Sequence, residues 1–459
     1  MKRTLPERDA WLLLGALTAL VLVSAPQLGS EPWRFRPGAV HPHGALAFVA
    51  RAAHERWDLG LMRSVAVLAG VLVLVAAAAA LAGRLPRRRT ATALAAAVVL
   101  ALVVPAVVLQ VALREATAPW FYVNDSTYEI ELAGQLVLHG HNPYGHDYSH
   151  SGLERFYSLD GTPPAANAAP PVALHHFAYF PGTALAAAAW SILPSPFDDF
   201  RFLVALATLA LLPAALAFRG PFGARLALGA ALAANPLAVR AAWFGTADAL
   251  CVLLIVLAFA FLTRSRYAAG AAVLGGAVLT KQFAVVALPF YAAMLLVRHA
   301  PLRRPAAACF GVIAVGVLPF LAADPGAFWR DTISYGGSTY RIIGYGLAAL
   351  LLRAHVLASR TGSYPFLPLV ALVWLPVTAW LVRVQLRRRA LWVGGVGFAI
   401  SIFLLLFLAR VFQTSYLVYP LAGAALACLL AGADVDDRAR VMPADGDREH
   451  VPAGSGGRP

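Results

Sequence analysis

The chain has 459 residues, of which 60 % are hydrophobic and only 13 % are charged, and its formal net charge is +14. The apolar residues form runs near or above the length that crosses about 30 Å of hydrocarbon, which excludes a soluble globular protein and predicts an all-α polytopic integral membrane protein. The basic residues stand in short clusters between these runs, so the charge is typical of cytoplasmic loops and argues against nucleic-acid binding.

Seven apolar runs are long enough to predict transmembrane helices. They cover residues 11–28, 62–83, 91–113, 305–323, 365–383, 391–409 and 411–431. With the basic clusters on the cytoplasmic side, both termini lie in the cytoplasm and the third run emerges outside. Residues 114–178 and 324–364 then form external loops, and the second loop is expected to contain a short interfacial helix.

The region between residues 177 and 298 is harder to divide, because three groups of arginines all favour the cytoplasmic side. Satisfying them requires one net crossing with a re-entrant piece before residue 218, and a hairpin or broken helix over residues 267–297. Gly275, Gly276 and Pro289 are the expected weak points of that second segment. About 12 transmembrane helices result.

The chain therefore divides into four regions. Residues 1–113 are N-terminal transmembrane segments, 114–178 are an external loop, 179–431 are a transmembrane core, and 432–459 are a tail. The tail is polar and rich in glycine and proline, so we expect a disordered cytoplasmic extension.

A polar stretch, NDSTYEIELAGQLVLHGHNPYG, opens the first long external loop at residues 124–145. Helical spacing predicts that Asp125 and Glu129 share one face at the membrane surface, and that the helix ends near Gly140. A carboxylate there suits a general base that acts on a hydroxyl whose partner substrate lies in the bilayer. From spacing alone, a helix-capping Asp125 on a solvated loop is the stronger interpretation.

This stretch resembles the first large external loop of the GT-C superfamily of membrane glycosyltransferases. It is most similar to the actinobacterial polyprenyl-phosphate-mannose-dependent mannosyltransferases of glycosyltransferase family 87, in which an Asp is followed by a Tyr, an Ala, a Gly and then Asn-Pro-Tyr. The residues in those places are Asp125, Tyr128, Ala133, Gly140, Asn142, Pro143 and Tyr144. Further matching segments follow in the same order: Asn235-Pro236 with Gly245 to Asp248, then Lys281, then Arg410 to Pro420.

The resemblance implies a GT-C fold and an enzyme that moves a sugar, with mannose favoured, from a polyprenyl-phosphate donor to a glycolipid or lipoglycan acceptor. Asp125 would take the acceptor proton, with inversion at the sugar, and basic residues would meet the leaving phosphate. The residues expected to bind the donor phosphate or the substrates are Lys281, Arg341, Arg410, Tyr128, Glu129, Asn142, Tyr144 and Asp248. No cofactor is implied, because the lipid-linked sugar is itself a substrate, and the chain has no nucleotide-binding Rossmann fingerprint.

The basic residues also have structural explanations. Lys281, deep in an apolar segment, could snorkel or pair with an acidic residue such as Asp248. Arg341 and Arg410 could be interfacial anchors. The histidines between residues 139 and 176 superficially resemble a metal site, but their spacing fits no standard zinc pattern, so a divalent metal is not indicated.

Two other functions stay open. Nothing in one sequence separates mannose from arabinofuranose or another hexose, so a different transferase of the same fold is one alternative. A lipid or sugar transporter is the other, because many spans, a buried lysine and a broken helix are also transporter features. Because no internal repeat is visible and the polar groups concentrate outside, the sequence favours an enzyme in the cell membrane, among membrane lipids, with its active site on the external side.

Overall fold

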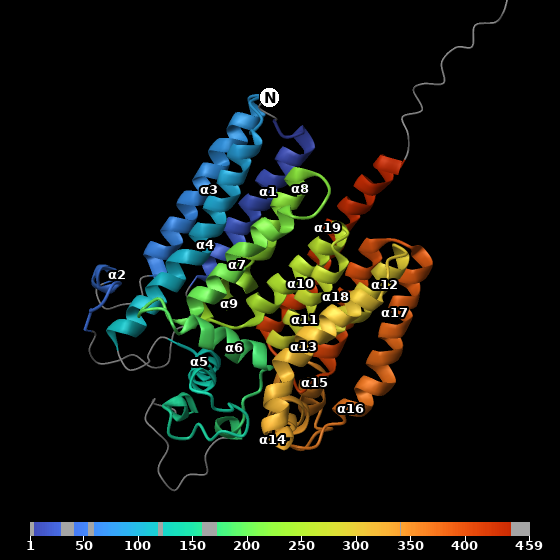
Figure 1. Cartoon of the computed structure of the whole chain (residues 1–459). Helices are drawn as coiled ribbons and strands as arrows, with labels where there is room; N and C mark the ends of the chain where they lie inside the picture. The colour runs from blue at the N-terminus through green and yellow to red at the C-terminus, as the bar shows by residue number, and fades with distance from the viewer. Residues whose placement is uncertain are drawn as a thin grey trace, which may run out of the picture.

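The structure is a computed structural model that describes residues 4–28, 41–53, 59–117, 123–157, 172–339 and 341–441. Of the residues that the structure describes, 76 % are helical. Within the described residues the only strands are β1 (Ile343–Gly344) and β2 (Val411–Phe412), which pair in parallel. Figure 1 shows a bundle in which most helices run along one direction. The fold is therefore all-α, as the sequence predicts.

Within the described residues, seven helical segments are long and apolar enough to cross a membrane, and each overlaps one of the seven predicted spans. An eighth candidate combines two helices bent by 45°. The segments are α1 (Glu7–Ser24), α3 (Leu59–Leu81), α4 (Arg88–Ala116), α13 (Arg303–Ala323), α16 to α17 (Phe366–Leu369 and Leu375–Arg388), α18 (Leu391–Leu408) and α19 (Val418–Val441), and the bent pair is α8 (Phe222–Ala234) with α9 (Pro236–Phe244).

The outer helices carry apolar side chains on the protein surface. Only 11 % of the apolar window of α13, and of the α16 to α17 segment, is buried inside the protein. Leu318 and Leu372 are among the large apolar side chains that point outward. Because so large an apolar surface is unfavourable in water, these helices face lipid and the protein is a multi-pass membrane protein.

Shorter helices occupy the middle of the bundle. At 1.5 Å per residue, α10 (Asp248–Thr263) and α11 (Tyr267–Thr280) are about 24 and 21 Å long, which is less than the thickness of the hydrocarbon core. The two helices lie side by side as a hairpin, so the start of α10 and the end of α11 meet. These central helices are α6 (Pro181–Trp190), α7 (Phe200–Leu216), α10 (Asp248–Thr263), α11 (Tyr267–Thr280) and α12 (Ala287–Val297).

The predicted break within residues 267–297 is present, but its position differs from the prediction. It lies at Lys281, whose backbone is extended between α11 and a short 3-10 turn. Gly275 instead allows α11 to approach α13, since a Cβ there would lie 2.6 Å from the carbonyl oxygen of Cys309. Gly276 also lies inside α11, and Pro289 lies in the first turn of α12, where a missing N–H costs little.

The predicted cytoplasmic turns gather at one end of the bundle, the upper end in Figure 1. The backbone N–H of Leu5 donates to the Pro86 carbonyl at 3.2 Å, beside the basic turn between α3 and α4. The N–H of Gly223, in the first turn of α8 beside the basic turn between α7 and α8, donates to the Asp9 carboxylate at 3.2 Å. These basic turns therefore lie together with the N-terminal segment, as the distribution of charge predicts.

The two predicted external loops meet at the opposite end, the lower end in Figure 1. There the Asp331 carboxylate accepts hydrogen bonds from the N–H groups of Gly145 and Phe177 at 2.9 and 3.2 Å. The elements of this end are α2 (Ala47–Ala52), α5 (Asp125–Leu138), two 3-10 turns (Leu153–Tyr157 and Val172–His175), α14 (Pro325–Trp329), a π-helix η5 (Arg330–Thr339) and the predicted short helix, α15 (Leu347–Arg353).

The predicted tail begins within a helix. α19 runs to Val441, so residues 432–441 are helical rather than disordered. The reason is that the apolar run continues into a segment without proline or glycine breaks between residues 433 and 441. The rest of the predicted tail lies outside the described residues.

Candidate functional site

The helix α5 begins with a side-chain cap. The Asn124 Oδ1 atom accepts hydrogen bonds from the Thr127 N–H and the Ser126 hydroxyl, both at 2.7 Å. Asp125 is the first helical residue, and its carboxylate accepts a hydrogen bond from the N–H of Ser126 at 2.8 Å. The capping explanation for the acidic residue is therefore wrong, because Asn124 satisfies the helix start. The helix ends near Gly140, as predicted.

The start of α5 is fixed to the corner between α9 and α10. The Thr127 hydroxyl contacts the carbonyl oxygens of Phe244 and Gly245 at 3.0 Å each. Gly245 has a φ of +89°, and a Cβ on it would lie 2.4 Å from the Thr127 hydroxyl. Only glycine combines this backbone conformation with so close a contact. The corner thus holds Asp125 next to α9 and α10.

One face of α5 lines a cavity of about 880 Å³. Asp125, Ser126 and Glu129 form part of its wall, so the prediction that the two carboxylates share a face is confirmed. Tyr128 points elsewhere, since its hydroxyl donates to the Ser151 carbonyl at 2.8 Å and its ring lines a separate pocket. The step of one residue along the helix places Tyr128 about 100° away from Glu129 around the axis of α5.

The cavity wall is partly apolar and includes exposed aliphatic side chains. Leu367 and Val285 belong to the wall and are 68 % and 45 % exposed. Leu237, Val370 and Leu405 add to the same wall. A cavity with carboxylates and an exposed aliphatic wall suits a ligand that has a polar head and an apolar chain.

Lys281 lies in this cavity wall and is ion-paired. Its Nζ atom lies 2.7 Å from Oδ1 of Asp248, which also accepts a hydrogen bond from the Tyr419 hydroxyl at 2.7 Å. The rings of Tyr179 and Tyr416 have their centroids 5.3 and 5.2 Å from the ammonium. The hairpin of α10 and α11 brings the two charges together, so pairing with Asp248 accounts for the lysine deep in an apolar segment.

Arg410 does not line the cavity, although its neighbours on both sides do. Its buried guanidinium donates to the carbonyl oxygens of Gly362 and Arg360 at 2.9 and 3.4 Å. Because successive residues of an extended segment point to opposite sides, Arg410 faces away from the cavity while Ala409 and Val411 face it. The predicted substrate contact of Arg410 is therefore not supported by where its side chain lies.

Asn142 and Tyr144 also serve the loop rather than the cavity. The Asn142 side-chain oxygen accepts from the N–H of Tyr144 at 3.1 Å, which closes the predicted turn. The hydroxyl of Tyr144 donates to the carbonyl of Tyr179 at 2.9 Å, and its buried ring contacts Phe177 and Phe328. The expectation that these two side chains bind substrate is therefore not supported by where they lie.

The two carboxyls of α5 differ in acidity. Burial raises the pKa of Asp125 above its usual range, while the Ser126 amide and the charge of Arg341 act in the opposite direction. Burial, together with the negative charges of Asp125 and Asp331, raises the pKa of Glu129 well above its ordinary value. As pH rises, Asp125 therefore loses its proton before Glu129 does. Arg341 is not part of the cavity wall but is a cation that acts on Asp125.

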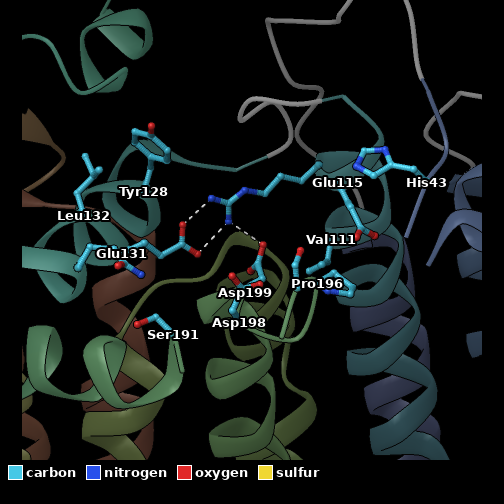
Figure 2. A pocket seen from close by; sticks show the side chains of 13 residues that line it. His43, Val111, Glu115, Tyr128, Glu131, Leu132, Ser191, Pro196, Asp198 and Asp199 are labelled. Atoms are coloured by element: carbon cyan, nitrogen blue, oxygen red, sulfur yellow. Dashed lines mark hydrogen bonds and ion pairs between the residues drawn. The ribbon is translucent and has the colours of Figure 1, made fainter. Parts of the chain in front are cut away.

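A charge cluster that the sequence did not single out holds α5 against α4 and α7 (Figure 2). The Arg114 guanidinium donates to Glu131 at 2.9 and 2.6 Å and to Asp199 at 2.7 Å. Asp199 also accepts from the Arg201 side chain at 2.8 and 2.7 Å. The sequence shows these charged residues near the ends of helices, but no spacing rule predicts that residues so far apart in the chain contact one another.

Arg240, Thr246 and Gln282 line the large cavity and were also missed. Within the described part of the chain, Thr246 Oγ1 and Gln282 Oε1 are buried without a hydrogen-bond partner. For Arg240 the signal in the sequence was a single charge in an apolar run, which is the same signal that identified Lys281.

The loop histidines lie around a different pocket. His139, His141 and His146 line a space of about 280 Å³ next to Leu132 and Gln135. Among the described residues, no group of three or more His, Cys, Asp or Glu side chains could hold a metal ion.

Comparison with known proteins found no matching family model, no matching curated protein and no matching solved structure. The chemistry is therefore argued from the cavity and its residues.

Proposed function

We propose that this chain is a GT-C type membrane glycosyltransferase that moves a sugar, with mannose favoured, from a polyprenyl-phosphate donor to a glycolipid or lipoglycan acceptor. The observation that carries the proposal is the cavity in which Asp125 and Glu129 share a wall with exposed aliphatic side chains. A lipid-linked sugar and a polar hydroxyl acceptor both fit such surroundings.

The apolar part of the wall suits the prenyl chain of the donor. Leu367 and Val285 are exposed there, so a chain that reaches the cavity from the bilayer keeps its methyl and methylene groups out of water. The carboxylates of α5 are available to the sugar and to the acceptor hydroxyl. A water-soluble nucleotide sugar would gain nothing from the aliphatic wall.

The proposed reaction is a single displacement. The acceptor oxygen attacks the anomeric carbon and its proton passes to the Asp125 carboxylate, while the bond between that carbon and the phosphate oxygen breaks. The electron pair leaves with the polyprenyl phosphate, and the sugar configuration inverts. Because burial and two nearby negative charges raise the pKa of Glu129 well above its ordinary value, Asp125 is the carboxyl of this face that gives up its proton first and is the better candidate for the base.

The proposed location is the cell membrane, with both termini cytoplasmic and the cavity on the external side. The gathering of the basic turns at one end of the bundle, and of α5 at the other, supports this orientation. About 12 crossings follow if each of the shorter central helices also counts as a span.

The test compares membranes that contain the wild type, Asp125→Asn or Asp147→Asn at equal protein level. Each receives radiolabelled polyprenyl-phosphate mannose or polyprenyl-phosphate arabinose and an actinobacterial lipid extract. Asp147 is a matched control, because it is an exposed carboxylate of the same loop that bonds locally to Ser149 and His175.

We expect transfer from one donor to fall at least about 100-fold in Asp125→Asn and to stay unchanged in Asp147→Asn. The donor that works then distinguishes a mannosyltransferase from an arabinofuranosyltransferase. Full transfer by Asp125→Asn would remove the base from the mechanism. No transfer from either donor would favour a transporter, for which the broken helix at the Lys281 and Asp248 ion pair is the supporting observation.

A further inference from the structure

We propose that Arg240 binds the phosphate of a prenyl-phosphate ligand in the large cavity, with Thr246 beside it and Gln282 reading a sugar hydroxyl. This inference rests on the proposed function for the nature of the ligand. It assigns the phosphate contact to an arginine of α9 rather than to Lys281, Arg341 or Arg410.

The helix α9 turns one face toward the cavity. Asn235 caps its start by accepting from the N–H groups of Leu237 and Ala238 at 3.1 and 3.0 Å. Leu237, Arg240 and Ala241 then follow at helical spacing, and all three belong to the cavity wall. The guanidinium of Arg240 is therefore carried into the cavity by the same face that supplies aliphatic contacts.

The charge of Lys281 is already balanced. Its ammonium lies 2.7 Å from the Asp248 carboxylate, which the Tyr419 hydroxyl also holds. A phosphate that approached Lys281 would meet a neutral pair with a carboxylate next to it, so the lysine attracts an anion weakly. Of the charged residues in the cavity wall, Arg240 is the guanidinium, which binds two phosphate oxygens at once.

Two buried polar atoms point to the rest of the ligand. Thr246 Oγ1 and Gln282 Oε1 have no hydrogen-bond partner within the described residues, and both side chains line the cavity. A buried polar atom that stays unsatisfied is costly, so a ligand is expected to complete it. A hydroxyl such as that of Thr246 donates to a phosphate oxygen, whereas the amide oxygen of Gln282 accepts from a sugar hydroxyl.

This arrangement places the phosphate contact next to the proposed base. The corner that carries Arg240 and Thr246 is bonded to the start of α5, through the Thr127 hydroxyl and the carbonyl oxygens of Phe244 and Gly245. Asp125 is two residues from Thr127 and lines the same cavity. A sugar between the base and the phosphate is therefore bounded by two segments that the Thr127 side chain joins by hydrogen bonds.

The test measures binding of farnesyl phosphate and of farnesol to the purified full-length protein in detergent by calorimetry. The two ligands share the apolar chain and differ in the phosphate, so their comparison isolates the contact. The variants are Arg240→Gln, Arg240→Lys and Thr246→Val. The control is Arg266→Gln, which removes the charge of an exposed arginine in the turn between α10 and α11.

We expect Arg240→Gln to weaken farnesyl phosphate binding about 10- to 100-fold and to leave farnesol binding unchanged. Arg240→Lys should fall between the wild type and Arg240→Gln, because it keeps the charge but loses the two-pronged contact. Thr246→Val should lose about 3- to 10-fold. Arg266→Gln should bind both ligands as the wild type does.

Equal farnesyl phosphate affinity in Arg240→Gln and the wild type would overturn the inference, as would a wild type that does not bind farnesyl phosphate. If Arg240→Gln does not fold, Arg240→Lys and Thr246→Val decide the question with the same ligands. Sugar transfer by the same preparations separates the two proposals. Binding through Arg240 without transfer would contradict the glycosyltransferase alone, and transfer with an unchanged KM in Arg240→Gln would contradict the phosphate site alone.

Discussion

The ion pairs of Arg114 predict a specific loss of stability in Arg114→Met. This substitution keeps an unbranched side chain of similar reach and removes the guanidinium that joins α4 to Glu131 and Asp199. Both carboxylates then lose a cation at less than 3 Å. The position of α5, and with it that of Asp125, depends on these contacts.

The size of the effect follows from burial. Removing one partner of a buried ion pair costs about 3–5 kcal/mol. The side chains of Arg114 and Glu131 are 18 % and 19 % exposed, so water partly replaces the lost contact, and Asp199 keeps its bonds to Arg201. The lower end of the range, about 3 kcal/mol, is therefore expected.

The assay is unfolding of the purified protein in mixed micelles with increasing SDS, followed by tryptophan fluorescence. Arg387→Met is the control, since Arg387 is exposed near the end of α17, and it should change stability by less than about 0.5 kcal/mol. Adding Glu131→Gln to Arg114→Met should recover at least about 0.5 kcal/mol, because it removes an uncompensated charge. An Arg114→Met protein as stable as the wild type would refute the reasoning.

Three further predictions concern the same region. Glu129 binds its proton more tightly in the folded protein than in the unfolded chain, because its pKa is raised on folding. The free energy of unfolding should therefore fall as pH rises from about 4.3 through the raised pKa. Glu129→Gln should flatten that dependence in unfolding experiments at several pH values. Asp331→Ala removes the acceptor that joins the two external loops, so amide hydrogen exchange in the first loop should become faster, whereas Asp331→Asn should exchange more slowly than Asp331→Ala. Gly245→Ala should destabilise the protein by about 1–3 kcal/mol more than Gly83→Ala, because both glycines have a positive φ but of the two only Gly245 lacks space for a Cβ. Equal losses of unfolding free energy in the two variants would contradict the close contact with Thr127.

The membrane spans and the bounds of α5 could be predicted from local sequence. A helix satisfies its own backbone hydrogen bonds, so hydropathy over one continuous run is enough to place it. The helical face that carries Asp125 and Glu129 follows from spacing in the same way. The break at Lys281 was placed incorrectly, because glycine and proline were read as weak points when Gly275 serves a close helix contact instead.

The sequence by itself determined that this is an all-α membrane protein with a carboxylate-bearing helix after its third span. Only the tertiary structure decided which charged side chains meet. Arg240 and Arg410 are both arginines beside apolar runs, yet one lines the cavity and the other holds backbone carbonyls. The physical reason is that the rotation of each helix or extended segment toward its neighbours is set by packing between segments far apart in the chain, and local spacing carries no information about that rotation.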